Sequence, residues 1–314
     1  MPLTIVIPTY NRHAILRENL PQLLRQMTPD CQLLILDDCS PTPVANELAD
    51  VLAAHPEASV EVVRHHTNLG MSGNLTRCFE RCETEWMWLL SDDDAVQPDA
   101  IKTIYRRIAA HPECIYFNFS SALARRETAH VTRGLAEFVE CMDYFGNVLF
   151  MSVGVYRTPA VRRQVRFGCH YGYSFAPHVA ILLAAIGPAE TCCYAPEEVV
   201  TWNPVREWPL VPFSLGIMTL LELPMDVRAF QALRHRIATD MRLLDMSYLA
   251  AQCRHVANSQ DNPPLAQHLF DQAYHRLIAS EGRLSDRLLY AVHRKLLVFP
   301  RLGERLVAAS RWLR

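Results

Sequence analysis

The sequence lacks the patterns that mark membrane-spanning, exported and zinc-binding proteins. No apolar run approaches the ~20 residues of a membrane-spanning helix, and the stretch MPLTIVIPTYNR has neither the basic lead nor the apolar core of an export signal. None of the ten cysteines belongs to a CxxC pair, so their spacing favours neither a zinc site nor a disulfide framework. There is no internal repeat and no low-complexity segment. We therefore expect a cytoplasmic protein with reduced, mostly buried cysteines.

Positive charge is scarce outside the C-terminal tail. The 31 basic and 33 acidic residues nearly cancel, but residues 283–314 hold eight Lys/Arg and only two Asp/Glu. The rest of the chain is acidic, with 23 basic and 31 acidic residues. Because a nucleic-acid binder would carry a basic patch, we expect no nucleic-acid partner.

Apolar periodicity predicts alternating strands and helices over the first 120 residues. The expected strands are residues 3–7, 32–36, 60–64, 86–90 and 114–119. The expected helices are residues 13–26, 44–54, about 74–82 and 98–110. This alternation predicts an α/β protein with a doubly wound, mostly parallel sheet.

Residues 121–205 are less regular, and the chain beyond them is helical. The expected elements are a hairpin at 120–136, a partial helix at 138–150, strands at 151–156, 191–194 and 199–202, helices at 158–165 and 179–186, and a loop at 167–178. Helices are also expected at 225–256, 264–280, 283–297 and 301–313. Because proline and tryptophan cluster at 204–212, we predict one domain over 1–205 and a helical region over 206–314.

Polar clusters follow the first four predicted strands. They are residues 8–12, Asp37–Asp38, residues 68–74 and Asp92–Asp94. Ligands of doubly wound sheets bind beyond the carboxyl ends of the strands, so these loops are expected to converge on one site. Adjacent carboxylates repel one another unless a cation or a donor lies between them. The aspartates therefore predict a metal site, although a solvated turn or a helix cap would use the same residue type.

Four of these stretches together resemble glycosyltransferase family 2. They are TIVIPTYNR, LLILDDCSP, NLGMSGN and WLLSDDDAVQPDAI, in this order. The resemblance covers about residues 1–120 closely and 150–205 loosely. It implies a GT-A fold, a nucleotide-binding half over 1–120 and an acceptor half over 121–205. It also implies an inverting transfer of sugar from a nucleotide-diphosphate sugar, assisted by Mn²⁺ or Mg²⁺.

The resemblance assigns roles to individual residues. It makes Asp93 the matched metal ligand, with Asp94 beside it and Asp92 near the ribose, while Ser91 stands where the family often has another aspartate. The residues expected to bind the nucleotide sugar are Pro8, Tyr10, Asp38, Asn68, Gly70, Asn74 and Asp92. Ordinary packing remains an alternative for Tyr10, and an Asx turn with Ser40 remains one for Asp38.

His178 is the expected catalytic base. Family members usually supply this base from an acidic pair before a helix, and here the matching place reads Ala176, Pro177, His178. Histidine can accept a proton at neutral pH, but a histidine at a helix start is often structural. Asp143, Glu197 and His170 are lesser candidates.

The resemblance implies a bacterial surface glycan or a lipid-linked glycan as acceptor, as in O-antigen and capsule assembly. The basic, amphipathic stretch 283–314 predicts contact with an anionic membrane at the inner face of the cell membrane. The alternative is packing on the catalytic domain or on a partner subunit in a homo-oligomer. The missing acidic pair leaves open a degenerate nucleotide- or glycan-binding scaffold. A sugar nucleotidyltransferase would need a glycine-rich basic loop after the first strand, where this chain has PTYNR.

Overall fold

The structure is a computed structural model that describes residues 1–201, 216–241, 245–259, 262–277 and 284–298. The chain divides into two compact units. The first comprises Met1–Glu207 with Leu223–Phe230, and the second comprises Trp208–Glu222 with Gln231–Arg314.

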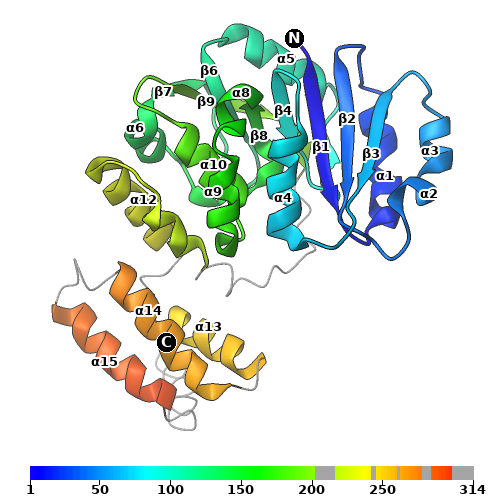
Figure 1. The fold of residues 1–314 in the computed structure, drawn as a ribbon. Helices are drawn as coiled ribbons and strands as arrows, with labels where there is room; N and C mark the ends of the chain where they lie inside the picture. The colour runs from blue at the N-terminus through cyan, green and yellow to red at the C-terminus, as the bar shows by residue number, and fades with distance from the viewer. Residues whose placement is uncertain (202–215, 242–244, 260–261, 278–283, 299–314) are drawn as a thin grey trace. The chain divides into compact units, whose positions relative to one another are not determined.

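An eight-stranded sheet forms the centre of the first unit (Figure 1). Its strands are β1 (Leu3–Thr9), β2 (Cys31–Asp37), β3 (Ser59–Arg64), β4 (Trp86–Leu89), β6 (Cys114–Ser120), β7 (His130–Arg133), β8 (Gly154–Arg157) and β9 (Thr191–Glu198). They lie in the order β3-β2-β1-β4-β8-β6-β9-β7. The pairs among β1 to β4 and the pair β6–β9 are parallel, whereas β8 and β7 run antiparallel to their neighbours. A second, two-stranded sheet pairs β5 (Ala95–Val96) with β10 (Val200–Thr201).

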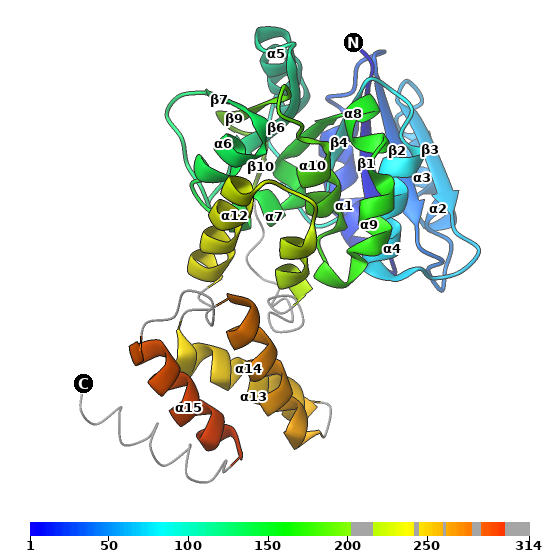
Figure 2. The same cartoon turned by 60° about the vertical axis from the view of Figure 1, so that its left-hand side comes forward.

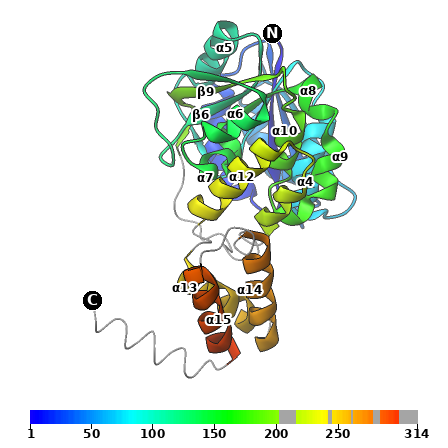
Figure 3. The same cartoon turned by 90° about the vertical axis from the view of Figure 1, so that its left-hand side faces the viewer.

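Helices cover both faces of the sheet, because the strands carry apolar side chains on both faces. On one face, α1 (His13–Leu24) and α5 (Ala100–Ala110) share a core cluster with inward residues of β1, β2 and β4. On the other face, α4 (Gly70–Arg81), α8 (Thr158–Arg162), α9 (Val165–His170) and α10 (Pro177–Ala185) pack together, as Figure 3 shows. The shorter helices are α2 (Val44–Glu47), α3 (Ala49–Ala53), α6 (Gly134–Glu140), α7 (Phe145–Leu149), and the 3₁₀ helices η1 (Met151–Val153) and η2 (Gly172–Ser174).

The strand directions place six carboxyl ends at one edge of the sheet. β1, β2, β3 and β4 are mutually parallel, and β6 points the same way because both β4 and β6 are antiparallel to β8. β9 is parallel to β6 and ends at that edge too. The loops after β1, β2, β3 and β4 are the ones in which the sequence places its polar clusters.

The second unit is helical. It holds η3 (Met218–Glu222), most of α12 (Val227–Asp240), and the mutually packed helices α13 (Met246–Ser259), α14 (Pro263–Leu277) and α15 (Leu284–Val298). Its buried side chains include Leu249, Cys253 and Phe270, and the Tyr290 ring stacks on Tyr274 with 3.7 Å between centroids. Among the described residues, no helix is both long and apolar enough to cross a membrane.

The predicted α/β class and mostly parallel sheet are confirmed, but several local predictions are wrong. Residues 120–136 do not form a hairpin, because β7 pairs with β9, which is about sixty residues further along the chain (Figure 2). The helix expected at 44–54 divides into α2 and α3, and the loop expected at 167–178 contains part of α9 and η2. The single helix expected at 225–256 is two helices, and the helix expected at 301–313 lies outside the described residues.

Candidate active site at the carboxyl edge of the sheet

Side-chain hydrogen bonds join the loops that follow β1, β2 and β3. Asn74, at the start of α4, donates from Nδ2 to the backbone carbonyls of Leu36 (3.1 Å) and Thr9 (3.5 Å). Its Oδ1 lies 3.1 Å from His65 Nε2. The buried Asn74 amide therefore braces two strand ends, and these contacts fit a structural role better than the predicted contact with a nucleotide.

The aspartate pair after β2 has two different environments. The two Asp37 oxygens accept from the backbone N–H groups of Ser40 (2.8 Å) and Val44 (3.2 Å), and Arg64 Nη1 lies 2.9 Å from Oδ2. Burial raises the pKa of Asp37, but these donors outweigh burial and hold it below its usual value. Asp38 is also buried, and its Oδ1 accepts from the Leu69 N–H (2.8 Å). Asp37 orders the loop, and Asp38 ties it to the turn before α4.

The three aspartates after β4 are not equivalent. Asp92 is only 3% exposed and accepts from Thr9 Oγ1 (2.8 Å) and Arg12 Nη1 (2.7 Å). Burial raises the pKa of Asp92, and Arg12 opposes that rise. Asp94 is buried and accepts from Ser152 Oγ (2.5 Å), which in turn accepts from the Ser91 N–H (2.9 Å).

Asp93 is the most exposed member of the trio. Its side chain is 18% exposed, and its Oδ1 accepts from Ser91 Oγ (2.5 Å). Its Oδ2 lies 3.3 Å from Arg12 Nη1. Ser91, which stands where the family often has an aspartate, orients the Asp93 carboxylate.

Arg12 is a site residue that the sequence-based assignment missed. One nitrogen, Nη1, contacts Asp92 at 2.7 Å and Asp93 at 3.3 Å, so it lies between the two carboxylates. Asp92 raises the pKa of Arg12, although burial of the guanidinium lowers it. The signal was present in PTYNR, because Arg12 follows β1 by three residues and therefore starts from the same sheet edge as the aspartates.

The remaining nucleotide-binding candidates lie on the exposed rim. Tyr10 is 46% exposed directly after β1, and Pro8 is partly buried within that strand. Asn68 accepts from the Gly70 N–H through its Oδ1 (2.8 Å), which closes the turn into α4. Gly70 has φ +72°, a conformation that favours glycine, and a Cβ there would meet no atom within 4 Å. Backbone conformation, not crowding, requires this glycine.

His178 is buried at the start of α10. Its Nε2 donates to the Leu149 carbonyl (3.0 Å), and its buried Nδ1 has no hydrogen-bond partner in the described structure. Burial lowers the pKa of His178 to about 4. A ring held neutral in this way is a weak base at pH 7, so its environment argues against the predicted catalytic role. The lesser candidates Asp143 and Glu197 pair with Arg126 and Arg107.

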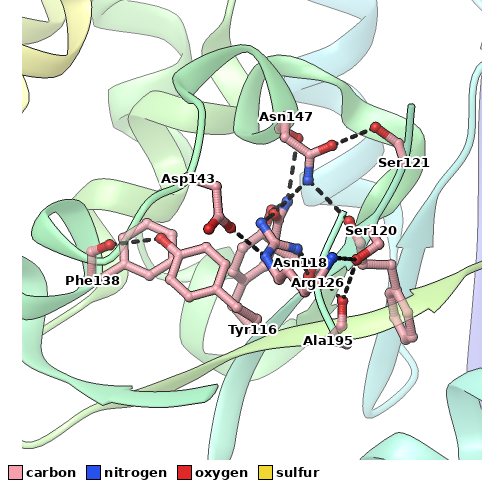
Figure 4. Close-up of polar contacts among 11 residues, drawn as sticks. Tyr116, Asn118, Ser120, Ser121, Arg126, Phe138, Asp143, Asn147 and Ala195 are labelled. Atoms are coloured by element: carbon pink, nitrogen blue, oxygen red, sulfur yellow. Dashed lines mark hydrogen bonds and ion pairs between the residues drawn. The ribbon is translucent and has the colours of Figure 1, made fainter. Parts of the chain in front are cut away.

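A buried polar network lies at the same sheet edge (Figure 4). Arg126 donates from Nη2 to Asn118 Oδ1 (2.9 Å), from Nη1 to the Asn118 carbonyl (2.9 Å), and from Nε to Asp143 (2.6 Å). Asn147 Nδ2 donates to Asn118 Oδ1 (2.7 Å), and Ser121 Oγ donates to Asn147 Oδ1 (2.6 Å).

The sheet register relates this network to the aspartates. Trp88 and Phe117 both pair with Val155, so β4 and β6 are in register across β8. Strands lie about 4.8 Å apart, so the end of β6 lies roughly 10 Å from the end of β4. A buried, hydrogen-bonded polar network therefore adjoins the aspartate loop on the side of residues 121–205.

The oxygen donors at the end of β4 fit a hard divalent cation. Carboxylate oxygens are the ligands that Mg²⁺ and Mn²⁺ prefer, usually one or two from the protein and the rest from phosphates and water. Asp93 has a partly exposed carboxylate, whereas Asp92 and Asp94 are buried and hydrogen-bonded. The arrangement suits a metal held by one protein carboxylate, with the other two as supports.

Comparison with known proteins places this site within a family. Residues 4–157 match the sequence model of Glycosyl transferase family 2. The succinoglycan biosynthesis protein ExoW of Rhizobium meliloti is 33% identical over 107 residues, which are 33% of each chain, so the match spans about a third of that relative's length.

Two solved structures share the fold. TarS of S. aureus in complex with UDP-GlcNAc has a TM-score of 0.60 at 14% identity, covering 96% of this chain and 92% of that one. The mannosyltransferase PcManGT of Pyrobaculum calidifontis, in complex with GDP-Man and Mn²⁺, has a TM-score of 0.55 at 14% identity, covering 94% of this chain and 80% of that one. The chain therefore carries a glycosyl transferase family 2 domain that includes residues 4–157.

Proposed function

We propose that the protein is a metal-dependent, inverting glycosyltransferase. It would move a sugar from a nucleotide-diphosphate sugar to a hydroxyl of a bacterial surface glycan or lipid-linked acceptor. The observation that carries the proposal is the partly exposed Asp93 carboxylate, held by Ser91 at an edge where three other polar loops meet. The nucleotide-sugar complexes of two proteins with the same fold support the donor class.

In this reaction the acceptor oxygen bonds to the anomeric carbon as the bond from that carbon to the diphosphate breaks. The nucleotide diphosphate leaves with the electron pair of the broken bond, and the proton of the acceptor hydroxyl passes to water or to the departing diphosphate. A divalent cation at Asp93 would neutralise charge on the departing diphosphate. Tyr10 would stack on the nucleobase, and Asp38 Oδ2 would accept from it. Asn68 and Gly70 would shape the turn beside the nucleotide, while Asp92, Asp94 and Asn74 hold the loops in place.

Arg12 would act as the counter-ion of the aspartates when no donor is bound. Its Nη1 lies between Asp92 and Asp93, close to where a bound cation would lie. The Arg12 side chain is 37% exposed, so it has room to turn away when the cation arrives with the diphosphate. The displaced guanidinium could then pair with a phosphate oxygen.

A second candidate function is donor or glycan binding without transfer. The observation that favours it is the burial of His178 at the place where the family usually carries its base. Only the first function predicts transfer of the sugar to a glycan acceptor. Incubating the full chain with radiolabelled nucleotide sugars and lipid extracts, and measuring label in the glycan fraction, separates them.

The proposed acceptor and the proposed membrane contact are supported by one relative's name and by the surface of α15. The name of ExoW connects one relative to succinoglycan biosynthesis, which agrees with a polysaccharide acceptor. On α15 the side chains of Leu288, Leu289 and Val292 are exposed next to the exposed Arg287 and Lys295, as expected for a helix at an anionic membrane surface. The remainder of 283–314 lies outside the described residues, and a homo-oligomer contact is the alternative use of this face.

A further inference from the structure

A cluster of three different ligand types lies away from the aspartates, at the corner between β7 and α6. His130 begins β7, Glu137 lies within α6, and Cys141 caps the end of that helix. One ligand atom from each side chain lies within 4.8 Å of the other two. His130 is exposed, whereas Glu137 and Cys141 are half-buried.

We propose that His130, Glu137 and Cys141 form a three-ligand site for a divalent transition-metal ion, and that its chemistry suits Zn²⁺. Imidazole nitrogen, carboxylate oxygen and thiolate sulfur are all zinc ligands, and thiolate discriminates against Mg²⁺ and Mn²⁺. With a thiolate and a carboxylate, the ligands carry two negative charges that a divalent ion neutralises. Three protein ligands leave one coordination position for water or another molecule.

The backbone holds the three residues in a fixed relation. Glu137 and Cys141 are four positions apart, so they lie on the same side of the helical turn. The adjacent Phe138 and Val139 are fully buried and anchor α6. Gly134 joins β7 directly to α6 at φ +75°, and its N–H donates to the Glu190 carbonyl (2.8 Å). β7 is itself paired with β9, with His130 opposite Tyr194.

One carboxylate oxygen is already positioned. Glu137 Oε2 accepts from the backbone N–H of Arg133 at 2.9 Å, which orients the carboxylate. Zinc–ligand distances of about 2.0–2.3 Å imply ligand separations of roughly 3.3–3.8 Å in a tetrahedral site. The three ligand atoms lie within 4.8 Å of one another, and this limit is about 1 Å above the separations of a bound tetrahedral site. Rotation of the side chains can supply a change of this size.

Sequence spacing could not indicate this site. The three residues span a strand, a turn and a helix, with no CxxC or His-x₃-His pattern, so they come together only through the sharp turn at Gly134.

The test uses the full chain, stripped of metal by a chelator and then titrated with Zn²⁺ alone or Co²⁺ alone. Wild type should take up one Zn²⁺ in competition with a chromophoric chelator, and its Co²⁺ form should show the near-ultraviolet band of a cobalt–thiolate bond. Cys141→Ser should lose the band, and His130→Ala should weaken Zn²⁺ binding at least 100-fold (~2.7 kcal/mol).

Glu137→Gln guards against misfolding, because its amide oxygen still accepts from the Arg133 N–H while binding metal poorly. It should keep the melting temperature of the metal-free wild type and lose Zn²⁺ affinity. Cys169→Ser removes an exposed thiol elsewhere and should change nothing. A cobalt–thiolate band that persists in Cys141→Ser, or equal Zn²⁺ affinity in wild type and His130→Ala, would overturn the proposal.

Discussion

Replacing Arg12 with glutamine should strengthen the binding of Mn²⁺ alone. In the structure Arg12 Nη1 lies 2.7 Å from Asp92 and 3.3 Å from Asp93, so an incoming cation at Asp93 must compete with a positive charge already there. Glutamine removes the charge and keeps a hydrogen-bonding side chain, although a shorter one. Arg17→Gln is the matched control, because Arg17 lies on α1, which begins directly after Arg12, and pairs instead with Asp50.

The expected size follows from the contacts. The pair between Arg12 and Asp93 is long and partly exposed, and exposed ion pairs are worth about 0.2–1 kcal/mol. Repulsion between a doubly charged cation and the guanidinium, turned aside to about 8 Å, adds about 1 kcal/mol in high dielectric. A total near 1.4 kcal/mol corresponds to about tenfold tighter binding.

The assay is titration of Mn²⁺ by electron paramagnetic resonance, with a nucleotide diphosphate titration in saturating Mn²⁺ beside it. In Arg12→Gln the first affinity should rise about tenfold, and the second should fall, because the guanidinium would no longer reach the diphosphate. The melting temperature should drop modestly, since Asp92 stays buried without its cation. Unchanged or weaker Mn²⁺ binding would show that Arg12 does not compete for this position.

Three further predictions test the buried ionisable groups and α15. Burial lowers the pKa of His178 to about 4 in the folded state, while the unfolded ring takes a proton below about pH 6.5. From pH 7 to pH 4.5 the free energy of unfolding of wild type, measured in urea, should therefore fall by about 2.5 kcal/mol. His178→Gln keeps a donor for Leu149 and should lack this fall, and equal falls in both proteins would refute the burial of His178. The pKa of Asp37 is lowered in the folded state, so the stability that Asp37 contributes is complete above about pH 4 and is lost as pH falls through the lower folded pKa. Arg64→Gln should flatten this pH dependence of the free energy of unfolding in the same assay, and an unchanged slope would contradict the role of Arg64. Leu288→Gln should reduce sedimentation with anionic vesicles but not with neutral ones, and equal sedimentation with wild type would count against a membrane role for α15.

The sequence predicts where the site lies better than it predicts the exposure and the hydrogen-bond partners of the site residues. Strand ends are local features of apolar periodicity, so the convergence of residues 8–12, 37–38, 68–74 and 92–94 on one edge could be expected from the sequence alone. Exposure depends on distant partners. Ser152, some sixty residues away, accounts for the burial of Asp94, and Leu149 accounts for the environment of His178.

Long-range pairing explains the other differences. β7 follows β6 in the chain with a short connection, which favours a hairpin. It nevertheless pairs with β9 and is the outermost strand of the sheet. The choice depends on residues 191–198, which no local pattern near residue 130 contains. The same pairing positions His130 beside α6 and so creates the three-ligand cluster.

The central claim is that Asp93 is the carboxylate through which a divalent cation couples to a nucleotide diphosphate. The most direct measurement is the melting temperature of wild type and Asp93→Asn with uridine, guanosine and thymidine diphosphates, with and without Mn²⁺. Asp99→Asn is the matched control, because Asp99 is an exposed aspartate between β5 and α5 with φ +59°, which asparagine tolerates. We predict that one nucleotide raises the melting temperature of wild type and Asp99→Asn only with Mn²⁺, and that Asp93→Asn loses the effect. Metal-dependent stabilisation that persists in Asp93→Asn would contradict the assignment.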